Sequence, residues 1–185
     1  MSIKYFIYCR KSTDSEDRQI ASLPAQRNVL TEYTKKANLE IADIYEESKS
    51  AFTPGRPKFN KIIERIENGE GNGVISWDAS RIARNTKDGG NFIYLMDIEK
   101  IIELRTPSKI YFNTPEDKFA LNIEFTVAKK SSDDLSKNVK RGNKHKFLVK
   151  KEWLGPAKPG YINYTDPITA EKRTISDKKR GTAPL

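Results

Sequence analysis

The chain has 185 residues and a hydrophobic content of 36%, which suits one ordinary domain with an appendage. One cysteine and one histidine exclude a disulfide framework and leave too few ligands for a zinc site, so no metal is expected. No apolar stretch approaches the roughly 20 residues of a membrane span, and we expect a cytoplasmic protein.

Charge is unevenly distributed along the chain, whose formal net charge is +9. Residues 1–136 hold 21 basic and 21 acidic residues, whereas residues 137–185 hold 13 basic and 4 acidic residues. A neutral body with a basic C-terminal extension is typical of a protein that binds a polyanion such as nucleic acid. The alternative is a solvated tail with no binding role.

Short apolar runs alternate with helical patterns over the first hundred residues. Strands are expected over residues 3–9, 39–45, 73–77 and 101–105. Helices are expected from an N-cap at Ser22 to Ala37, and from Arg56-Pro57 to Asn68-Gly69. Strands separated by helices of this length predict an α/β fold with a mainly parallel sheet flanked by helices.

A long helix is expected after this domain. Thr114 and Pro115 form a good helix start, with acidic residues following. Apolar residues from Phe119 to Val127 alternate with period two, but the apolar series then continues at helical spacing, so we predict one helix over residues 115–141. Apolar side chains on more than one side predict packing on its own domain and on a second subunit, with a final core helix as the alternative.

The segment beyond Gly142 is basic and rich in glycine and proline. Its positive charges are interleaved with Trp153, Tyr161 and Tyr164, which suits a segment laid along a nucleic-acid groove and equally suits a linker. The expected DNA-binding residues are Lys140, Arg141, Lys144, Lys146, Lys150 and Lys151. We therefore predict an α/β domain over residues 1–112, a long helix over 113–142, and the start of a truncated DNA-binding domain or a linker over 143–185.

Arg10 and Ser12 stand two residues apart where the first strand meets a loop. Residues two apart on an extended segment project to the same side, so a guanidinium and a hydroxyl can face one ligand. If that ligand is a phosphodiester, the arginine can bind a non-bridging oxygen while the serine attacks phosphorus.

Three more arginines, Arg56, Arg81 and Arg84, follow the second and third strands. Functional groups of an α/β sheet gather beyond the carboxyl ends of its strands, so we expect these arginines to converge with Arg10. Phosphoryl transfer needs positive charge fixed around the reacting phosphorus, and converging arginines can supply it in place of a metal.

Several sequence blocks resemble, in order and approximate spacing, the signature blocks of the serine site-specific recombinases. The first four are Tyr8-x-Arg10-x-Ser12, Ser22-Leu23-x-x-Gln26, Glu47-x-x-Ser50 with Gly55-Arg56-Pro57-x-Phe59, and Arg81-Ile82-Ala83-Arg84-Asn85. The later blocks resemble the large serine recombinases rather than the small resolvases: Ala128-Lys129-Lys130, Leu135-Ser136-x-Asn138-Val139-Lys140-Arg141-Gly142 and Gly155-Pro156-x-x-Pro159-x-Tyr161. The resemblance covers about residues 5–164.

The resemblance implies a resolvase-like catalytic domain that cleaves and rejoins DNA. Ser12 would attack a DNA phosphodiester, form a 5′-phosphoserine link and release a 3′-hydroxyl. The residues that would bind the scissile phosphate and stabilise its transition state are Arg10, Arg56, Arg81 and Arg84, and the supporting polar residues are Tyr8, Gln26 and Glu47. Because the ester keeps the bond energy, rejoining needs no nucleotide cofactor, and the chain has no glycine-rich phosphate loop.

The resemblance also implies partners. The long helix matches the family's dimerisation helix, whose end leads into double-stranded DNA. We therefore expect a homodimer that forms a tetramer in the synaptic complex.

Two departures from the family pattern limit these expectations. The family usually has Asp immediately before the first arginine of the Arg81 block, whereas this chain has Ser80, with Asp78 the nearest acid. The further residues and the cysteine-ligated zinc module of large members are missing, so we expect an engineered fragment or a truncated gene product. Such a fragment should recombine poorly or not at all, because base-reading elements are lacking.

Other classes of protein fit less well. A nonenzymatic DNA-binding module with a basic tail is the main alternative, although it assigns no purpose to the arginines and Ser12. A cysteine phosphatase built on Cys9 would need arginine at Ser15, which excludes it. A regulatory receiver-type module would need a cluster of acids at the strand ends, where this chain has arginines.

Overall fold

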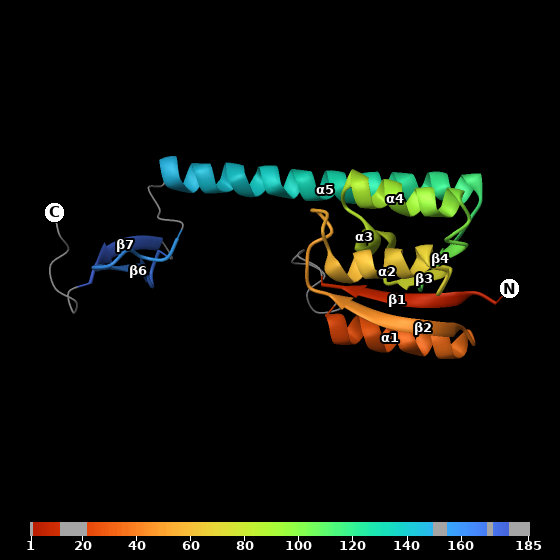
Figure 1. The fold of residues 1–185 in the computed structure, drawn as a ribbon. Coiled ribbons are helices and arrows are strands. Elements are labelled where there is room, and N and C mark those ends of the chain that lie inside the picture. Colours follow the sequence, from red (N-terminus) through yellow and green to blue (C-terminus); the bar gives the residue numbers. More distant parts are fainter. Residues whose placement is uncertain (1, 12–21, 150–154, 170–171, 178–185) are drawn as a thin grey trace. The chain divides into compact units, whose positions relative to one another are not determined.

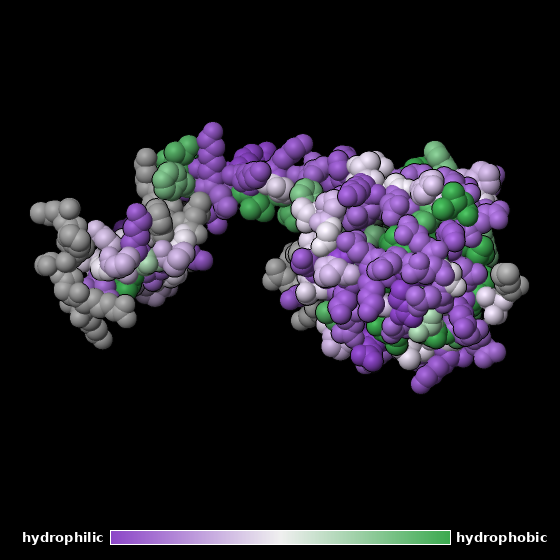
Figure 2. Space-filling model, in the orientation of Figure 1, coloured by the Kyte–Doolittle hydropathy of each residue, from purple (hydrophilic) through white to green (hydrophobic). Residues whose placement is uncertain are grey.

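The computed structural model describes residues 2–11, 22–149, 155–169 and 172–177 (Figure 1). The chain divides into two compact units, Met1–Ser132 and Asp133–Leu185. Within the described ranges, no helix combines the length and the apolar character that a membrane span requires. Figure 2 shows that hydrophilic side chains cover most of the face of the first unit turned toward the viewer.

The first unit is built on a five-stranded sheet with the order β2-β1-β3-β4-β5. Its strands are β1 (Lys4–Arg10), β2 (Glu40–Glu47), β3 (Gly73–Ser76), β4 (Glu103–Arg105) and β5 (Ile110–Phe112). All pairs are parallel except β4 with β5, which is antiparallel. The predicted mainly parallel sheet is confirmed; β5 was not predicted, because three residues are too few to show a strand period.

Helices cover both faces of this sheet, with α1 on one face and α2 and α4 on the other (Figure 1). Their bounds are α1 (Leu23–Lys36), α2 (Pro57–Glu67), α3 (Ala79–Ile82), α4 (Thr86–Asp97) and α5 (Pro115–Leu148). Ser22 caps α1 by accepting a hydrogen bond from the backbone N–H of Ala25, and α2 begins at Pro57, as the cap and proline signals predict.

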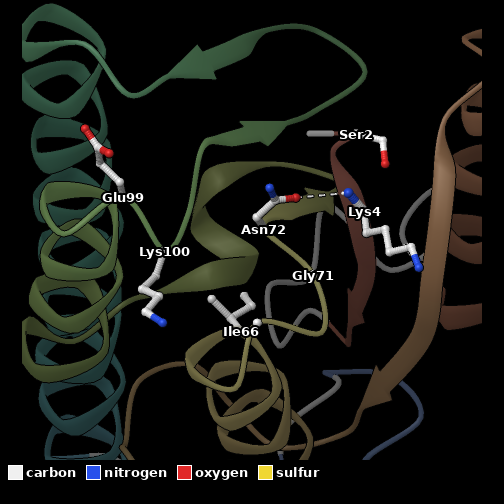
Figure 3. Close-up of a pocket in the computed structure, with 8 residues that line it drawn as sticks. Ser2, Lys4, Ile66, Gly71, Asn72, Glu99 and Lys100 are labelled. Atoms are coloured by element: carbon white, nitrogen blue, oxygen red, sulfur yellow. Dashed lines mark hydrogen bonds between the residues drawn. The ribbon is translucent and has the colours of Figure 1, made fainter.

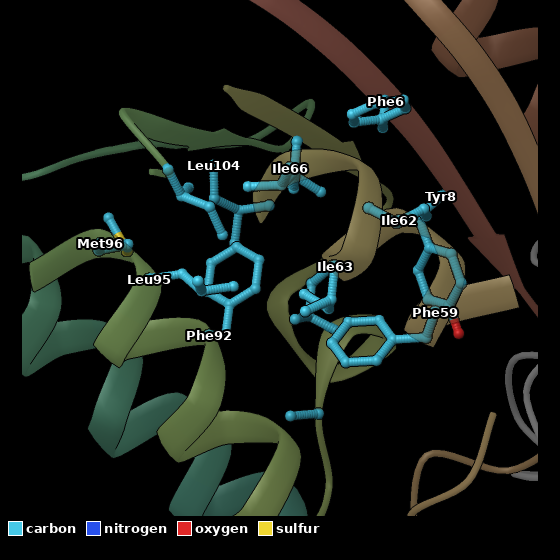
Figure 4. Packing of buried hydrophobic residues seen from close by; sticks show 14 of the residues in the cluster. Phe6, Tyr8, Phe59, Ile62, Ile63, Ile66, Phe92, Leu95, Met96 and Leu104 are labelled. Carbon is cyan, nitrogen blue, oxygen red and sulfur yellow. The ribbon is translucent and has the colours of Figure 1, made fainter. Parts of the chain in front are cut away.

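Strand β1 lies at the centre of the core because it contributes to both faces. Tyr5, Ile7 and Cys9 pack with α1, whereas Phe6 and Tyr8 pack with the larger cluster formed by α2, α4 and α5 (Figure 4). A strand buried on both faces reads as a continuous apolar run, which is what the sequence shows here. The alternation places the next residue, Arg10, on the same side of the strand as Phe6 and Tyr8.

Helix α5 resolves the ambiguous period-two pattern into two stripes on different sides of one helix. Leu121 and Phe125, four residues apart, are buried in the core of the first unit, where Phe125 meets Phe92 edge-on at 6.2 Å between ring centroids. Phe119, Ile123 and Val127, also spaced by four, are exposed. Both stripes have the four-residue spacing of a helix. The helix predicted from the Thr114 and Pro115 start signal is therefore confirmed over the strand that the period-two pattern suggested.

The predicted end of this helix at Arg141-Gly142 is wrong, because α5 continues to Leu148. A single glycine inside a helix costs only about 1 kcal/mol relative to alanine, and basic residues favour the last turn of a helix. His145 and Lys146 lie in that last turn.

The second unit also contains a β-hairpin formed by β6 (Tyr161–Thr165) and β7 (Lys172–Ser176). Residues 155–160 have no helix or strand, as their glycine and proline content predicts, but the hairpin that follows was not predicted. Its side chains are mostly exposed, so the strand pattern lacks the buried face that makes strands recognisable in a sequence. Trp153 lies outside the described residues.

Candidate active site

The four predicted arginines meet at the carboxyl ends of β1 and β3. This is the point where the strand order reverses, since β1 has β2 on one side and β3 on the other. The side chains of Arg10, Arg56, Arg81 and Arg84 are all buried there. Such switch points are the usual location of ligand sites in open α/β sheets.

The backbone carbonyl of Arg81 joins two of the guanidinium groups. It accepts a hydrogen bond from Arg10 Nε at 3.1 Å and one from Arg56 Nη1 at 3.3 Å. Arg10 comes from the end of β1 and Arg56 from the start of α2, so one peptide group of the α3 segment connects three elements.

Each guanidinium nitrogen of Arg10 donates to a backbone carbonyl. Its Nη1 and Nη2 donate to the carbonyls of Lys11 and Ser80 at 2.9 and 3.1 Å. The side chain of Gln26 forms a reciprocal pair with the Arg10 backbone, accepting from its N–H and donating to its C=O. Burial, followed by the neighbouring Arg84 and Arg81, lowers the pKa of Arg10 to about 9, so it stays positively charged at neutral pH.

Arg81 and Arg84 lie on and just after α3. Arg81 Nε approaches Asp78 Oδ2 at 3.3 Å, and the backbone N–H of Arg84 donates to the carbonyl of Ala51 at 3.2 Å. The carboxylate beside Arg81 therefore comes from Asp78. Ser80, where the family pattern has Asp, contributes its backbone carbonyl to Arg10.

Of the predicted supporting residues, Tyr8 contacts an arginine side chain, whereas Glu47 binds backbone groups near one. The Tyr8 hydroxyl accepts a hydrogen bond from Arg56 Nη1 at 3.0 Å, and burial raises the pKa of Tyr8 to about 12 despite the lowering effect of Arg56 and Arg10. The Glu47 carboxylate instead accepts backbone N–H groups of Lys49 and Lys58 at 3.2 and 3.0 Å. Glu47 thus ties the end of β2 to the start of α2.

The remaining predicted site residues fall into two groups. Ser12 lies outside the described residues, as do Lys150 and Lys151. Lys140, Arg141, Lys144 and Lys146 are exposed on α5 in the second unit.

Sequence reasoning missed Asp88, a buried carboxylate that pairs with Arg56 at 2.8 Å. Asn85 caps α4 by accepting a hydrogen bond from the backbone N–H of Asp88. A polar cap followed three residues later by an acid is a helix-start signal, and it could have identified both α4 and this carboxylate.

The opposite end of the sheet carries a hollow that lacks comparable chemistry (Figure 3). Its two lysines are engaged, Lys4 with Glu40 at 3.1 Å and Lys100 with the carbonyl of Glu67 at 3.1 Å. Across the described part of the chain, no group of three His, Cys, Asp or Glu side chains could hold a metal ion. The arginine cluster is therefore the candidate active site.

Comparisons with known proteins agree on one family. The family model described as "Resolvase, N terminal domain" matches residues 5–150. A "Resolvase" of Clostridium perfringens is 28% identical over 141 residues, covering 74% of this chain and 68% of the relative. Another, from Clostridium perfringens strain 13 / Type A, is 30% identical over 139 residues, covering 73% and 67%.

A solved structure shares the fold. The N-terminal catalytic domain of TP901-1 integrase is 22% identical, with a TM-score of 0.51, over 72% of this chain and 98% of that domain. The fold of this chain thus has a known structural counterpart.

Proposed function

Since this chain belongs to the resolvase family of site-specific DNA recombinases, we propose that it cleaves and rejoins DNA through a 5′-phosphoserine intermediate. The family predicted from the sequence blocks is confirmed by the match over residues 5–150. The phosphoserine chemistry is our inference from the arginine cluster and from Ser12, two residues after Arg10.

The proposed reaction is a pair of transesterifications. The Ser12 hydroxyl loses its proton and its oxygen attacks the scissile phosphorus, forming a P–O bond to serine. The bond from phosphorus to the 3′ oxygen breaks, and the released oxygen takes up a proton to become a 3′-hydroxyl. Rejoining reverses these steps with the 3′-hydroxyl of another strand, so no nucleotide or metal takes part in the balance.

The observation that carries this proposal is the burial of four arginines at the carboxyl ends of β1 and β3, with Ser12 two residues beyond Arg10 in the sequence. Positive charge fixed in a water-poor site stabilises the charge that develops on the phosphoryl oxygens of the transition state. Arg10 suits this role, because among the described residues each of its two Nη atoms donates one of its two N–H groups to a carbonyl.

We assign the remaining predicted residues to supporting and DNA-holding roles. Gln26 orients the end of β1. Tyr8 and Glu47 support the start of α2, which carries Arg56. Residues 1–112 form the catalytic domain in this proposal, α5 (Pro115–Leu148) the dimerisation helix, and the residues after it a DNA-binding segment. The proposed phosphate contacts outside the active site are Lys140, Arg141, Lys144, Lys146, Lys150 and Lys151.

Dimerisation is assigned to the exposed apolar stripe of α5. Phe119, Ile123 and Val127 lie on one side of the helix, and an apolar surface of this kind is stabilised when a second subunit covers it. We propose a homodimer that pairs into a tetramer around two DNA sites in the cytoplasm. Light scattering should show a decrease in mass from dimer to monomer in Ile123→Glu.

Covalent capture tests the proposed chemistry. A library of nicked duplexes with randomised sequence lets a short 3′-hydroxyl strand diffuse away after cleavage, which traps the protein on the 5′ end. We expect a protein–DNA adduct that survives denaturation, is absent in Ser12→Ala and is present in Ser108→Ala, a serine in the β4–β5 turn. A salt-sensitive gel shift without any adduct would instead identify a nonenzymatic DNA-binding module.

A further inference from the structure

We propose that Asp88 is a positioning residue that acts through Arg56 to fix the segment carrying Arg81 and Arg84. In this assignment Arg56 is itself a positioning residue and does not bind the phosphate. The inference rests on the proposed function and deepens it. It divides the arginine cluster into the residues that contact DNA and one residue, Arg56, that holds them in position.

Both Nη groups of Arg56 already donate to protein acceptors, whereas its buried Nε has no hydrogen-bond partner among the described residues. Its Nη1 donates to Tyr8 Oη at 3.0 Å and to the carbonyl of Arg81 at 3.3 Å. Its Nη2 donates to the carbonyl of Ile82 at 2.6 Å and to Asp88 Oδ2 at 2.8 Å. All four Nη hydrogens are thereby used, and Cζ of Arg56 lies 3.9 Å from the centre of the Phe59 ring.

Binding a phosphate oxygen through these hydrogens would break an existing hydrogen bond. The displaced acceptor would then be a buried carbonyl, hydroxyl or carboxylate, and a buried polar group without a partner is costly. Arg10 differs, since its Nε, Nη1 and Nη2 each have one acceptor, all of them carbonyls. Among the described residues, two Nη hydrogens of Arg10 therefore remain for a ligand, whereas Arg56 keeps no Nη hydrogen and only its buried Nε–H.

The acceptors of Arg56 are the reason for calling it a positioning residue. Two of them are the successive carbonyls of Arg81 and Ile82, so the guanidinium fixes the orientation of the peptide groups between Arg81 and Ala83. The direction in which Arg81 and Arg84 project depends on those peptide groups. A shift of about 1 Å in catalytic groups can lower a rate by about 100-fold.

Asp88 anchors this arrangement from α4. Its Oδ2 accepts from both Arg56 Nη2 and Asn85 Nδ2 at 2.8 Å. Asn85 Nδ2 also donates to the carbonyl of Ala51 at 2.9 Å, the same carbonyl that accepts the backbone N–H of Arg84. The network therefore holds the Arg84 segment at both ends, by Arg56 on one side and by Ala51 on the other.

Single-turnover cleavage of the trapped substrate tests the assignment. We expect Asp88→Asn to slow adduct formation by about 100-fold while the dissociation constant for DNA stays unchanged. Arg56→Gln should slow it by a similar factor, and the double variant should be no slower than Arg56→Gln alone, because both residues act through one path. Additive effects in the double variant would overturn the proposal.

A matched control separates positioning from general stability. Glu103→Gln removes another buried carboxylate that pairs with an arginine, Arg105, on β4. We expect this variant to lose stability but to cleave at the wild-type rate at a temperature where it is folded. Equal slowing in Glu103→Gln and Asp88→Asn would show that the effect is not specific to the Arg56 network, and would contradict the assignment.

A neutral substrate distinguishes positioning from phosphate contact. A methylphosphonate at the scissile position has no charge for an arginine to neutralise, so it should reduce the defect of Arg10→Ala relative to wild type. The defect of Arg56→Gln should persist on this substrate. Recovery of Arg56→Gln would show that this arginine contacts the phosphate.

Hydrogen exchange tests the network without relying on catalysis. In Asp88→Asn and Arg56→Gln, exchange of the Arg84 amide should accelerate at least about tenfold, with β1 still protected. Unchanged exchange would overturn the positioning role even if the wild-type protein cleaves DNA. Faster exchange together with a lack of any Ser12-dependent adduct in the wild type would instead reject the proposed function and leave the network intact.

Discussion

The two units of the chain use positive charge in opposite ways. In Met1–Ser132 the important arginines are buried, and Arg10 and Arg56 have defined acceptors. In Asp133–Leu185 the basic residues of α5, such as Lys144 and Lys146, are exposed. The first arrangement fixes charge in place, whereas the second presents charge to solvent.

Because of this difference, we expect the buried arginines to affect the reaction rate and the exposed basic residues to affect DNA affinity. A buried guanidinium held by carbonyls needs little reorganisation when charge develops on a phosphate, so it lowers the barrier of the reaction. An exposed lysine loses most of its field to water and salt, but it adds to DNA affinity by releasing counterions. Changes in the buried group should therefore alter stability and rate, and changes in the exposed group should alter the salt dependence of binding.

The largest expected effect is on the stability of the first unit. Asp88→Asn leaves the buried Arg56 charge without its carboxylate, and breaking such a pair costs about 3–5 kcal/mol. Urea unfolding monitored by circular dichroism should show a lower midpoint with an unchanged slope. A loss of unfolding free energy below about 1 kcal/mol would mean that this buried pair contributes no more than a surface ion pair. Buried and exposed charges would then not differ in the way proposed.

Next in size is the effect of Arg10 on the cleavage rate. Removing one fixed donor to a developing oxyanion typically lowers a rate by about 10²–10³-fold, and we expect Arg10→Ala to fall in this range. Arg10→Lys should recover only part of the rate, because an ammonium cannot reproduce the planar fork that bonds to Arg81 and Ser80. Single-turnover adduct formation at saturating DNA measures both. Equal rates in the wild type and Arg10→Ala would exclude Arg10 from the transition state.

The exposed charges should give a smaller effect of a different kind. Replacing Lys144 and Lys146 with glutamine should reduce the slope of log affinity against log salt concentration by about 0.9 for each phosphate that the variant no longer neutralises. The cleavage rate at saturating DNA should not change. Fluorescence anisotropy across a salt series measures the slope, and a slope equal to that of the wild type would show that these lysines do not bind phosphates.

The sequence predicted those parts of the fold that depend on local signals. Ser22 and Pro57 mark helix starts by capping chemistry, and the apolar run of β1 follows from burial on both faces. The convergence of the arginines also followed, since strand ends of a parallel sheet share an edge.

Other features depend on tertiary contacts and were not predictable in the same way. The sequence predicts Arg56 as a phosphate ligand, and that role stays a prediction. Its hydrogen-bond acceptors come from β1, α3 and α4, and no local pattern identifies them. Gly142 looked like a helix end, yet helical neighbours carry α5 through it. The hairpin of β6 and β7 has no buried face and hence no clear period.

The smallest expected effect comes from an exposed ion pair in the first unit. Arg27 and Glu46 are 3.1 Å apart, as close as many buried pairs, but their side chains are 55% and 36% exposed. Solvent screens such a pair, so Glu46→Gln should cost only about 0.2–1 kcal/mol of unfolding free energy, and less at high salt. Urea unfolding at two salt concentrations measures this directly against Asp88→Asn. Because the two pairs are alike in chemistry and distance, a clear difference in cost isolates burial as the cause, whereas equal costs would mean that burial contributes nothing to how this protein holds its arginines.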